Sequence, residues 1–157
     1  MGFRMSRTPD RRELASAHLG RLLLHAHRRV QVDSIAKLQE RGHGEVRTGH
    51  IPVFSNVDKD GTRITDLAAR AGMTRQMMGR LVRELESLGY ATSRSDPADQ
   101  RAIVVSLTEN GWRFCDDAQE VMVELEREYA DLLGDDGLHR LRDALLTLGS
   151  AGGEQPA

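Results

Sequence analysis

The chain has 157 residues, enough for one compact domain with a hydrophobic core or for one domain with helical extensions. It is 39% hydrophobic and 29% charged with few aromatic residues, a composition typical of a helix-rich protein with aliphatic packing. No apolar run approaches the roughly 20 residues that span a bilayer, so we expect no membrane association. The single cysteine, Cys115, excludes an internal disulfide and favours a reducing, cytoplasmic compartment.

Charge is divided unevenly along the chain. Residues 1–101 contain 18 Lys and Arg against 12 Asp and Glu, a net charge of +6, whereas residues 102–157 contain 4 against 12, a net charge of −8. Phosphate binding needs a local positive face and does not need a positive overall charge. The overall charge of −2 is therefore compatible with nucleic-acid binding, although an ordinary solvated surface can also be uneven.

The first predicted element is a long helix over residues 10–41, in which apolar residues recur at spacings of three and four. Gly42-His43-Gly44 interrupts it. A short helix over residues 49–57 follows, and its predicted core residues are Ile51, Val53, Phe54 and Val57. The next segment, Asp58–Gly61, is predicted to be a turn. Its Asp-x-Asp-Gly pattern resembles the start of a calcium loop, but the later ligands of such a loop are missing.

Two further helices, over residues 65–71 and 74–88, form a helix-turn-helix pattern. Gly72 falls at the turn, where a left-handed backbone is needed, and Ala68 falls where the helices cross closely. Thr74 is a predicted N-cap of the second helix and Gly89 a predicted C-terminal cap. The positions that pack the two helices together are Leu67, Ala71, Met73, Met78 and Leu81.

The second of these helices carries several polar residues on the face away from that packing. Arginine can bind guanine with two hydrogen bonds, and glutamine can bind adenine in the same way. A glycine on this face would allow close approach to a groove of DNA. The alternative is an ordinary surface helix near a tight turn. The residues predicted to face DNA here are Thr74, Arg75, Gln76, Gly79, Arg80 and Arg83.

A β-hairpin follows, with strands over residues 90–94 and 102–107 around an Asp96-Pro97 turn. Such a hairpin beside a helix-turn-helix is a wing. Arg101 at its tip can reach the minor groove while the recognition helix occupies the adjacent major groove. Asp99 is predicted to orient the guanidinium of Arg101 or Arg94, which would keep the wing rigid. We therefore add Arg94, Asp99 and Arg101 to the predicted DNA-binding residues.

The last part of the chain, residues 109–149, is predicted to be helical. Thr108 caps a long helix with an apolar stripe from Phe114 to Leu132, and residues 134–137 break it. A final leucine stripe begins at Leu138 with nearly coiled-coil spacing, and residues 150–157 are predicted to be a disordered tail. Together with the first helix, these stripes exceed the needs of a small winged domain and predict a homodimer. Packing of the two ends within one chain is the alternative.

Two segments make the chain similar to MarR-type winged helix-turn-helix transcriptional regulators. Asp99-Gln-Arg101-Ala-Ile-Val-Val-Ser-Leu-Thr-Glu-Asn-Gly111 resembles that family's wing and the start of the next helix, and Leu81–Tyr90 resembles the end of its recognition helix. The resemblance covers nearly all of residues 1–157. It implies a mainly α fold with a small β-hairpin wing, in which a winged helix-turn-helix region at residues 49–108 lies between N- and C-terminal dimerisation helices, residues 10–41 and 109–149.

The same resemblance implies a homodimer that binds a pseudo-palindromic double-stranded DNA operator and usually represses transcription. In that family a small ligand, often an aromatic acid, or a metal or cysteine oxidation releases the DNA. For an aromatic-acid-like effector the candidate residues are Arg28, Arg29, Arg47 and His50, which the sequence does not rank.

Other functions are weighed against this one. The histidines lack compact metal-ligand spacing, so we expect no metal and no cofactor. Cys115 lies far from the N-terminal position of the family's reactive cysteines, and neighbouring Asp116 and Asp117 disfavour a thiolate, so an enzyme with a cysteine nucleophile is not expected. A metal- or redox-sensing regulator of the same architecture stays open, as does a DNA-packaging protein without sequence specificity.

Overall fold

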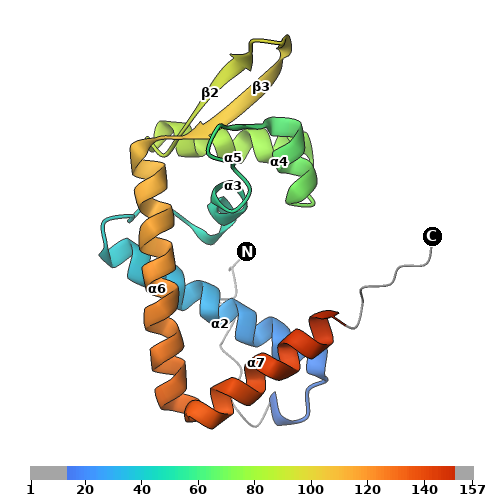
Figure 1. Ribbon diagram of the computed structural model, residues 1–157, viewed down its shortest axis with the longest axis vertical. Helices are drawn as coiled ribbons and strands as arrows, with labels where there is room; N and C mark the ends of the chain where they lie inside the picture. The colour runs from blue at the N-terminus through green and yellow to red at the C-terminus, as the bar shows by residue number, and fades with distance from the viewer. Residues whose placement is uncertain (1–13, 151–157) are drawn as a thin grey trace, which may run out of the picture.

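The computed structural model describes residues 14–150. It places a helix-turn-helix with a small sheet at one end of the molecule and long helices at the other (Figure 1). Helix α6, Glu109–Leu133, connects the two ends, α2, Leu19–Glu40, packs across it, and α7, Asp135–Ser150, folds back from its far end. Six helices of at least four residues and one small sheet in the described range confirm the mainly helical fold class. Ser150, the first residue of the predicted tail, is the last residue of α7, and residues 151–157 lie outside the described residues.

The predicted first helix is interrupted near its start. Leu14 and Ala15 are helical, residues 16 and 17 form a turn and a bend, and α2 begins at Leu19 after an extended His18 that supplies no side-chain cap. The apolar periodicity continues across this break and therefore did not reveal it. Residues 10–13 of the predicted helix lie outside the described residues. At the other end, α2 stops at Glu40 and Gly42 adopts a left-handed φ of 99°.

The second predicted helix is shorter than residues 49–57. A 3₁₀ turn, Thr48–His50, leads into α3, Ile51–Phe54. Asn56 then donates a side-chain hydrogen bond to the carbonyl of Pro52 at 2.8 Å. This bond satisfies a carbonyl that a continuing helix would use, and it accompanies the end of the helix. Three of the predicted core residues are buried and the fourth is half-buried, in the order Val53, Phe54, Val57 and Ile51.

The helix-turn-helix is close to its prediction. Helix α4 covers Ile64–Arg70 and α5 covers Arg75–Ser87. Thr74 caps α5 by accepting a hydrogen bond from the Met77 N–H at 3.2 Å. Gly72 and Gly89 have φ angles of 62° and 78°, the left-handed conformation expected at a turn and at a helix C-terminus.

The sheet has three antiparallel strands in the order β1-β3-β2. Strand β2, Ala91–Asp96, and strand β3, Asp99–Leu107, form the predicted wing and extend to its tip, where Asp96 pairs with Asp99 after an irregularity. Strand β1, Thr62–Arg63, was not predicted and pairs with the other edge of β3. Because β1 directly precedes α4, the wing is joined to the start of the helix-turn-helix.

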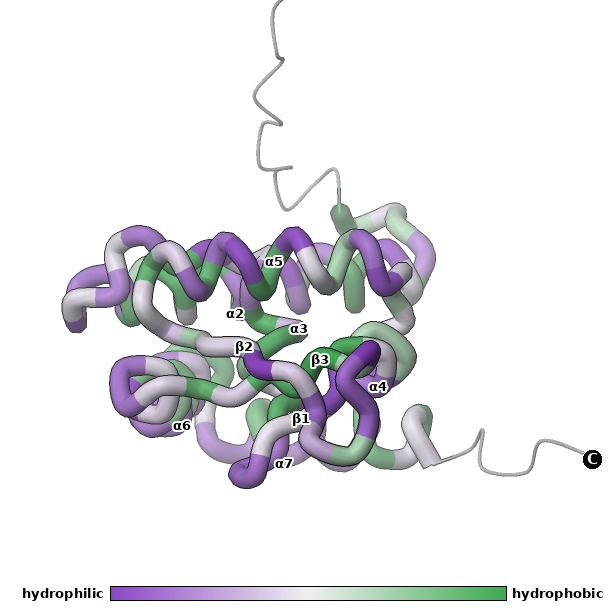
Figure 2. Tube along the Cα trace, turned by 90° about the horizontal axis from the view of Figure 1, so that it is seen from above, coloured by the Kyte–Doolittle hydropathy of each residue, from purple (hydrophilic) through white to green (hydrophobic). Residues whose placement is uncertain are grey.

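One hydrophobic core joins the winged end to α2 and α6. The Phe54 and Phe114 rings stack at a centroid distance of 4.1 Å, and the buried stripe of α6 continues through Val121 and Leu125. The stripe then reaches the surface, since Leu132 is 79% exposed. Seen from above, α5 alternates between polar and apolar segments along its length (Figure 2). None of the helices in residues 14–150 has an apolar stretch that would cross a bilayer.

Candidate nucleic-acid interface

Helix α5 has one face in the core and an opposite face in solvent. Met78, Val82 and Leu85 are buried at intervals that follow the helical repeat. The residues about half a turn away from them are exposed, namely Gln76, Arg80, Arg83 and Ser87. The sequence prediction of an outward polar face is therefore correct for Gln76, Arg80 and Arg83.

Gly79 is an exception, because it is buried, although it lines a cavity together with Gln76 and Arg83. A Cβ added there would lie 3.6 Å from Ile64 Cδ1 and 3.4 Å from Arg83 Nη1. The glycine therefore contacts α4 and leaves room for the Arg83 guanidinium to lie back along the helix. The prediction that Gly79 points away from the core is therefore wrong, whereas its close approach to a DNA groove stays a prediction.

Glu84, one turn after Arg80, contacts two arginines and one histidine. One carboxylate oxygen accepts from Arg80 Nε at 3.0 Å, and the other accepts from Arg47 Nη2 at 2.7 Å and contacts His50 Nε2 at 3.0 Å. The His50 hydrogen bond and then the Arg80 hydrogen bond hold the pKa of Glu84 below its ordinary value. A buried histidine therefore ties the recognition helix to the 3₁₀ turn before α3.

Arg75 lies on the side of α5 that faces the wing. It lines a cavity of about 430 Å³ that also includes Arg83 and Ile103, and a second cavity of about 200 Å³ that includes Arg101 and Ile103. The two cavities share Ile64, Arg75 and Ile103. They form a groove between α5 and the wing, which we call the wing groove, with arginines on both sides.

The wing tip differs in detail from its prediction. The Asp99 carboxylate accepts the backbone N–H of Arg101 at 3.1 Å, and within residues 14–150 it forms no ion pair with Arg101 or Arg94. Its short side chain satisfies the local backbone of the turn instead, as Asp often does. Both arginines are exposed.

Asp96 provides the ion pair that fixes the wing. It accepts from the Ala98 N–H at 2.8 Å, and its other oxygen pairs with Arg63 Nη2 at 2.6 Å. The Ala98 hydrogen bond and then the Arg63 hydrogen bond lower the pKa of Asp96. Arg63 escaped the sequence analysis because its strand has only two residues, which is too short for an alternating pattern.

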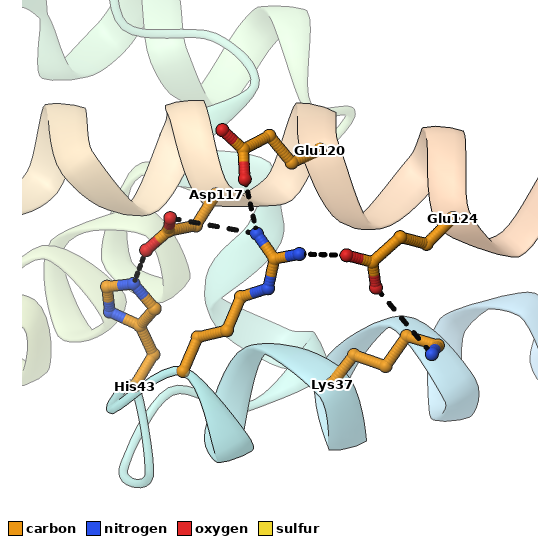
Figure 3. Close-up of polar contacts among 6 residues, drawn as sticks. Lys37, His43, Asp117, Glu120 and Glu124 are labelled. Carbon is orange, nitrogen blue, oxygen red and sulfur yellow. Dashed lines mark hydrogen bonds and ion pairs between the residues drawn. The ribbon is translucent and has the colours of Figure 1, made fainter.

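A line of charged contacts joins α2 to α6 (Figure 3). Lys37 pairs with Glu124 and Glu128, and Arg41 contacts Asp117, Glu120 and Glu124. We call these contacts the α2–α6 charge ladder. Several of its acids are partly exposed, so we expect each rung to contribute little alone and the network to set how the two helices align.

His43 ends the charge ladder inside the core. Its ring is fully buried, with Nε2 2.8 Å from Asp117 Oδ2 and Nδ1 2.9 Å from the Tyr90 hydroxyl. In the sequence, His43 stands between two glycines, a pattern that indicates a loop. No local pattern could reveal that its partners come from α6 and from the start of β2.

Two alternatives to DNA binding, a cysteine nucleophile and a metal site, receive no support from the described residues. Burial raises the pKa of the half-buried Cys115 thiol, and Asp116 raises it further, which makes a thiolate nucleophile unfavourable. Among residues 14–150 no group of three His, Cys, Asp or Glu side chains is arranged to hold a metal ion.

Three comparisons place the chain among known proteins. The model of the MarR family matches residues 47–102, which contain α3, the helix-turn-helix and most of the wing. An uncharacterized protein of Mycobacterium tuberculosis is 30% identical over 112 residues, covering 67% of this chain and 78% of that protein. Among solved structures, a MarR-family transcriptional regulator from Rhodococcus sp. RHA1 is 25% identical with a TM-score of 0.64, covering 83% of this chain and 91% of that one.

A further similar structure is that of the transcriptional repressor CouR, bound to a 23-mer DNA duplex. It is 23% identical, with a TM-score of 0.67 over 90% of this chain and 96% of that one. The fold, the matched helix-turn-helix and wing, and these relatives agree. The chain therefore belongs to the MarR family, whose members are transcriptional regulators and not enzymes.

Proposed function

We propose that this protein is a sequence-specific, ligand-responsive repressor that binds a pseudo-palindromic operator as a homodimer in the cytoplasm. The observation that carries the DNA-binding part is the wing groove. Arg75 and Arg83 of α5 and Arg101 of the wing lie on its two sides, and all three are exposed. A recognition helix in the major groove and a wing in the minor groove would place a sugar-phosphate strand over this groove.

The individual contacts follow from these positions. Gln76 and Arg80 on the outermost face of α5 are proposed to reach base edges. Thr74, Arg75 and Arg83 are proposed to contact phosphates, and Arg101 the minor groove. Arg75 is assigned to the DNA backbone because it lines both cavities of the wing groove. CouR, which is similar in fold and bound to a duplex, supports a DNA-binding role for this surface.

A second copy of the chain is the proposed partner of the long helices. Apolar side chains of α2 and α7 are exposed, among them Leu19 at 57% and Leu148 at 54%. A cavity of about 230 Å³ between α2, α6 and α7 is lined mainly by apolar residues that include Val30, Leu141 and Leu145. In a dimer, α2 and α7 would bury these apolar side chains against the same helices of the second copy. A two-fold symmetric dimer would then bind the two inverted half-sites of a palindromic operator.

The proposed effector site is a cavity of about 380 Å³ between α5 and the 3₁₀ turn. Met73, Met77 and Leu81 supply apolar lining, and Arg47 and His50 supply polar groups. This combination suits an aromatic acid, with its ring on the methionines and its carboxylate near the arginine. Of the four candidates from the sequence, Arg47 and His50 line this cavity, whereas Arg28 and Arg29 do not.

The test uses purified full-length protein and a pool of random duplexes. Repeated selection should enrich an inverted repeat, and fluorescence anisotropy should show that this repeat binds at least about 1,000-fold more tightly than scrambled DNA. Light scattering at micromolar concentration should give a dimer. Equal binding to selected and scrambled DNA would instead support a packaging protein, and a monomer would contradict the dimer.

A further inference from the structure

We propose that Arg80 reads a guanine in the major groove through its two terminal guanidinium nitrogens, and that Glu84 is the positioning residue that aims it. This inference rests on the proposed DNA-binding function of α5. It goes further by assigning one base to one side chain and by giving an acidic residue a part in specificity.

The first argument is the geometry of Arg80. Its Nε donates to Glu84 Oε1 at 3.0 Å across one helical turn, and its side chain is 78% exposed on the outermost face of α5. In the part of the chain that the structure describes, no other acid pairs with it. Because Nε is engaged, the edge that stays free carries Nη1 and Nη2.

The free edge of Arg80 matches guanine. Two parallel N–H donors in a planar fork suit two acceptors on one edge, and guanine presents O6 and N7 in the major groove. Adenine presents N7 beside the N6 amino group, which is a donor and opposes one of the arginine N–H groups. The arrangement therefore selects guanine over adenine at one position in each half-site.

The second argument is that Glu84 is itself held in place. Its other oxygen contacts His50 Nε2 at 3.0 Å and Arg47 Nη2 at 2.7 Å. His50 is buried, and its Nδ1 accepts the backbone N–H of Arg47 at 3.2 Å. A carboxylate anchored on a buried ring is a fixed partner, so Arg80 loses less side-chain freedom when it meets a base.

The other arginines of the interface lack this support. Within residues 14–150, none of Arg75, Arg83 and Arg101 forms an ion pair with an acid. A mobile guanidinium suits a phosphate, which accepts hydrogen bonds from several directions, and suits a base edge less well. Arg80 alone among these four arginines has its donor edge set by a carboxylate.

The experiment starts from the inverted repeat selected by the wild-type protein. Each guanine of a half-site is replaced in turn by adenine or by 7-deazaguanine, which lacks the N7 acceptor, and binding is measured by anisotropy. At one position adenine should weaken wild-type binding by roughly 5- to 150-fold, the range of a lost bidentate contact. The 7-deazaguanine duplex should show a smaller loss at that position.

Variants then connect the position to the residues. Arg80→Ala should lose the preference at that base pair and keep the preferences elsewhere, and Arg80→Lys should weaken that preference and keep the salt dependence of binding. Glu84→Gln keeps an oxygen that can accept from Nε and should reduce the preference less than Glu84→Ala does. The matched control is Glu86→Ala, which removes an acid of the same helix that binds Ser93 and leaves Arg80 untouched.

The outcomes separate the two proposals. A selected repeat whose guanine preferences all survive Arg80→Ala overturns the assignment of Arg80. Loss of the preference in Arg80→Ala with full retention in Glu84→Ala overturns the role of Glu84. Helical content and dimer size are measured for each variant, and a decrease in either identifies unfolding as the cause of a general loss of DNA binding. If the Glu84 variants unfold, the Arg80 variants, whose side chain is exposed, still test the guanine contact. A wild-type protein that selects no sequence refutes the proposed function itself.

Discussion

The hydroxyl of Tyr90 lies 2.9 Å from Nδ1 of His43, a ring that has no exposure to solvent. Asp117 lies 2.8 Å from the other ring nitrogen and, as a carboxylate, can only accept. Nε2 therefore donates to Asp117, and the Tyr90 hydroxyl is the hydrogen-bond partner of Nδ1. The residue that follows the recognition helix is thus bound to a loop and, through the ring, to α6.

Removing this hydroxyl should destabilise the fold. Tyr90→Phe leaves His43 Nδ1 buried without a partner, so the free energy of unfolding should fall by about 1–3 kcal/mol. Urea denaturation followed by circular dichroism measures the change. Tyr129→Phe is the matched control, because its hydroxyl contacts Asp33 at 3.2 Å in a half-buried position and should matter less. Equal losses in the two variants would contradict the importance of the buried contact.

Gly111→Ala should also destabilise the fold, for a steric reason. An added Cβ would lie 2.2 Å from the carbonyl oxygen of Tyr90 and 3.0 Å from Leu107 Cβ, so backbone must move. We expect a loss of about 1–3 kcal/mol or more in the free energy of unfolding. Gly44→Ala meets nothing within 4 Å and should stay within about 0.5 kcal/mol of the wild type. Thermal unfolding of both variants tests this, and comparable midpoints would disprove the clash.

Gly79→Ala should have the opposite sign. The contacts of the added Cβ, 3.4 Å and 3.6 Å, can be accommodated, and alanine favours the helix by about 0.5–1 kcal/mol. DNA affinity should change only through displacement of Arg83. Titrations in an Arg83→Ala background should therefore give the same affinity with Gly79 and with alanine. A further loss in that background would mean that the glycine faces DNA after all.

The wing ion pair should make stability depend on acid. The pKa of Asp96 in the folded protein is lowered from its ordinary value of 3.8, so the folded state favours the carboxylate. Its stabilising effect is complete above pH 3.8 and is lost as the pH falls through the lowered folded-state pKa. The difference in melting temperature between wild type and Asp96→Asn should therefore shrink in this acidic range. A pH-independent difference between wild type and Asp96→Asn would contradict the role of this ion pair.

Arg101→Ala should weaken operator binding without changing the fold. The exposed arginine is proposed to enter the minor groove, which is narrow and strongly negative in A·T-rich DNA. The slope of log affinity against log salt should become shallower by about one unit, and the preference for flanking A·T pairs should fall. Asp99→Ala should do less, since the cation remains. Unchanged operator affinity in Arg101→Ala would exclude the wing from DNA reading.

The elements predicted correctly are those whose conformation depends on residues close to them in the sequence. Thr74 caps its own helix, Gly72 and Gly89 adopt the backbone conformation that only glycine reaches easily, and the α5 stripe follows the helical repeat. Each of these depends on neighbours within a few residues. The family resemblance then supplied the arrangement of these elements around the wing.

The features that were missed have partners far along the chain. Strand β1 pairs with β3 some forty residues later, and His43 meets Asp117 across 74 residues. The ion pair that holds the wing joins Arg63 to Asp96, whereas the sequence had predicted one that involves Asp99. Which acid meets which base depends on how β1, β3 and α6 approach one another in space. Residue type and local spacing do not contain that information.

Tyr90 has a mechanical consequence for the recognition helix. Its N–H bonds back to Leu85, its carbonyl accepts from Thr108, and its hydroxyl is held by His43. The C-terminal end of α5 is therefore bound at three points of one residue, whereas its N-terminal end, which carries Arg75 and Gln76, packs on α4. A small rotation of α5 about Tyr90 would displace Arg75 and Gln76 in proportion to their distance from Tyr90, so a shift of α6 against the 42–44 loop would be felt most at the DNA-facing end of the helix.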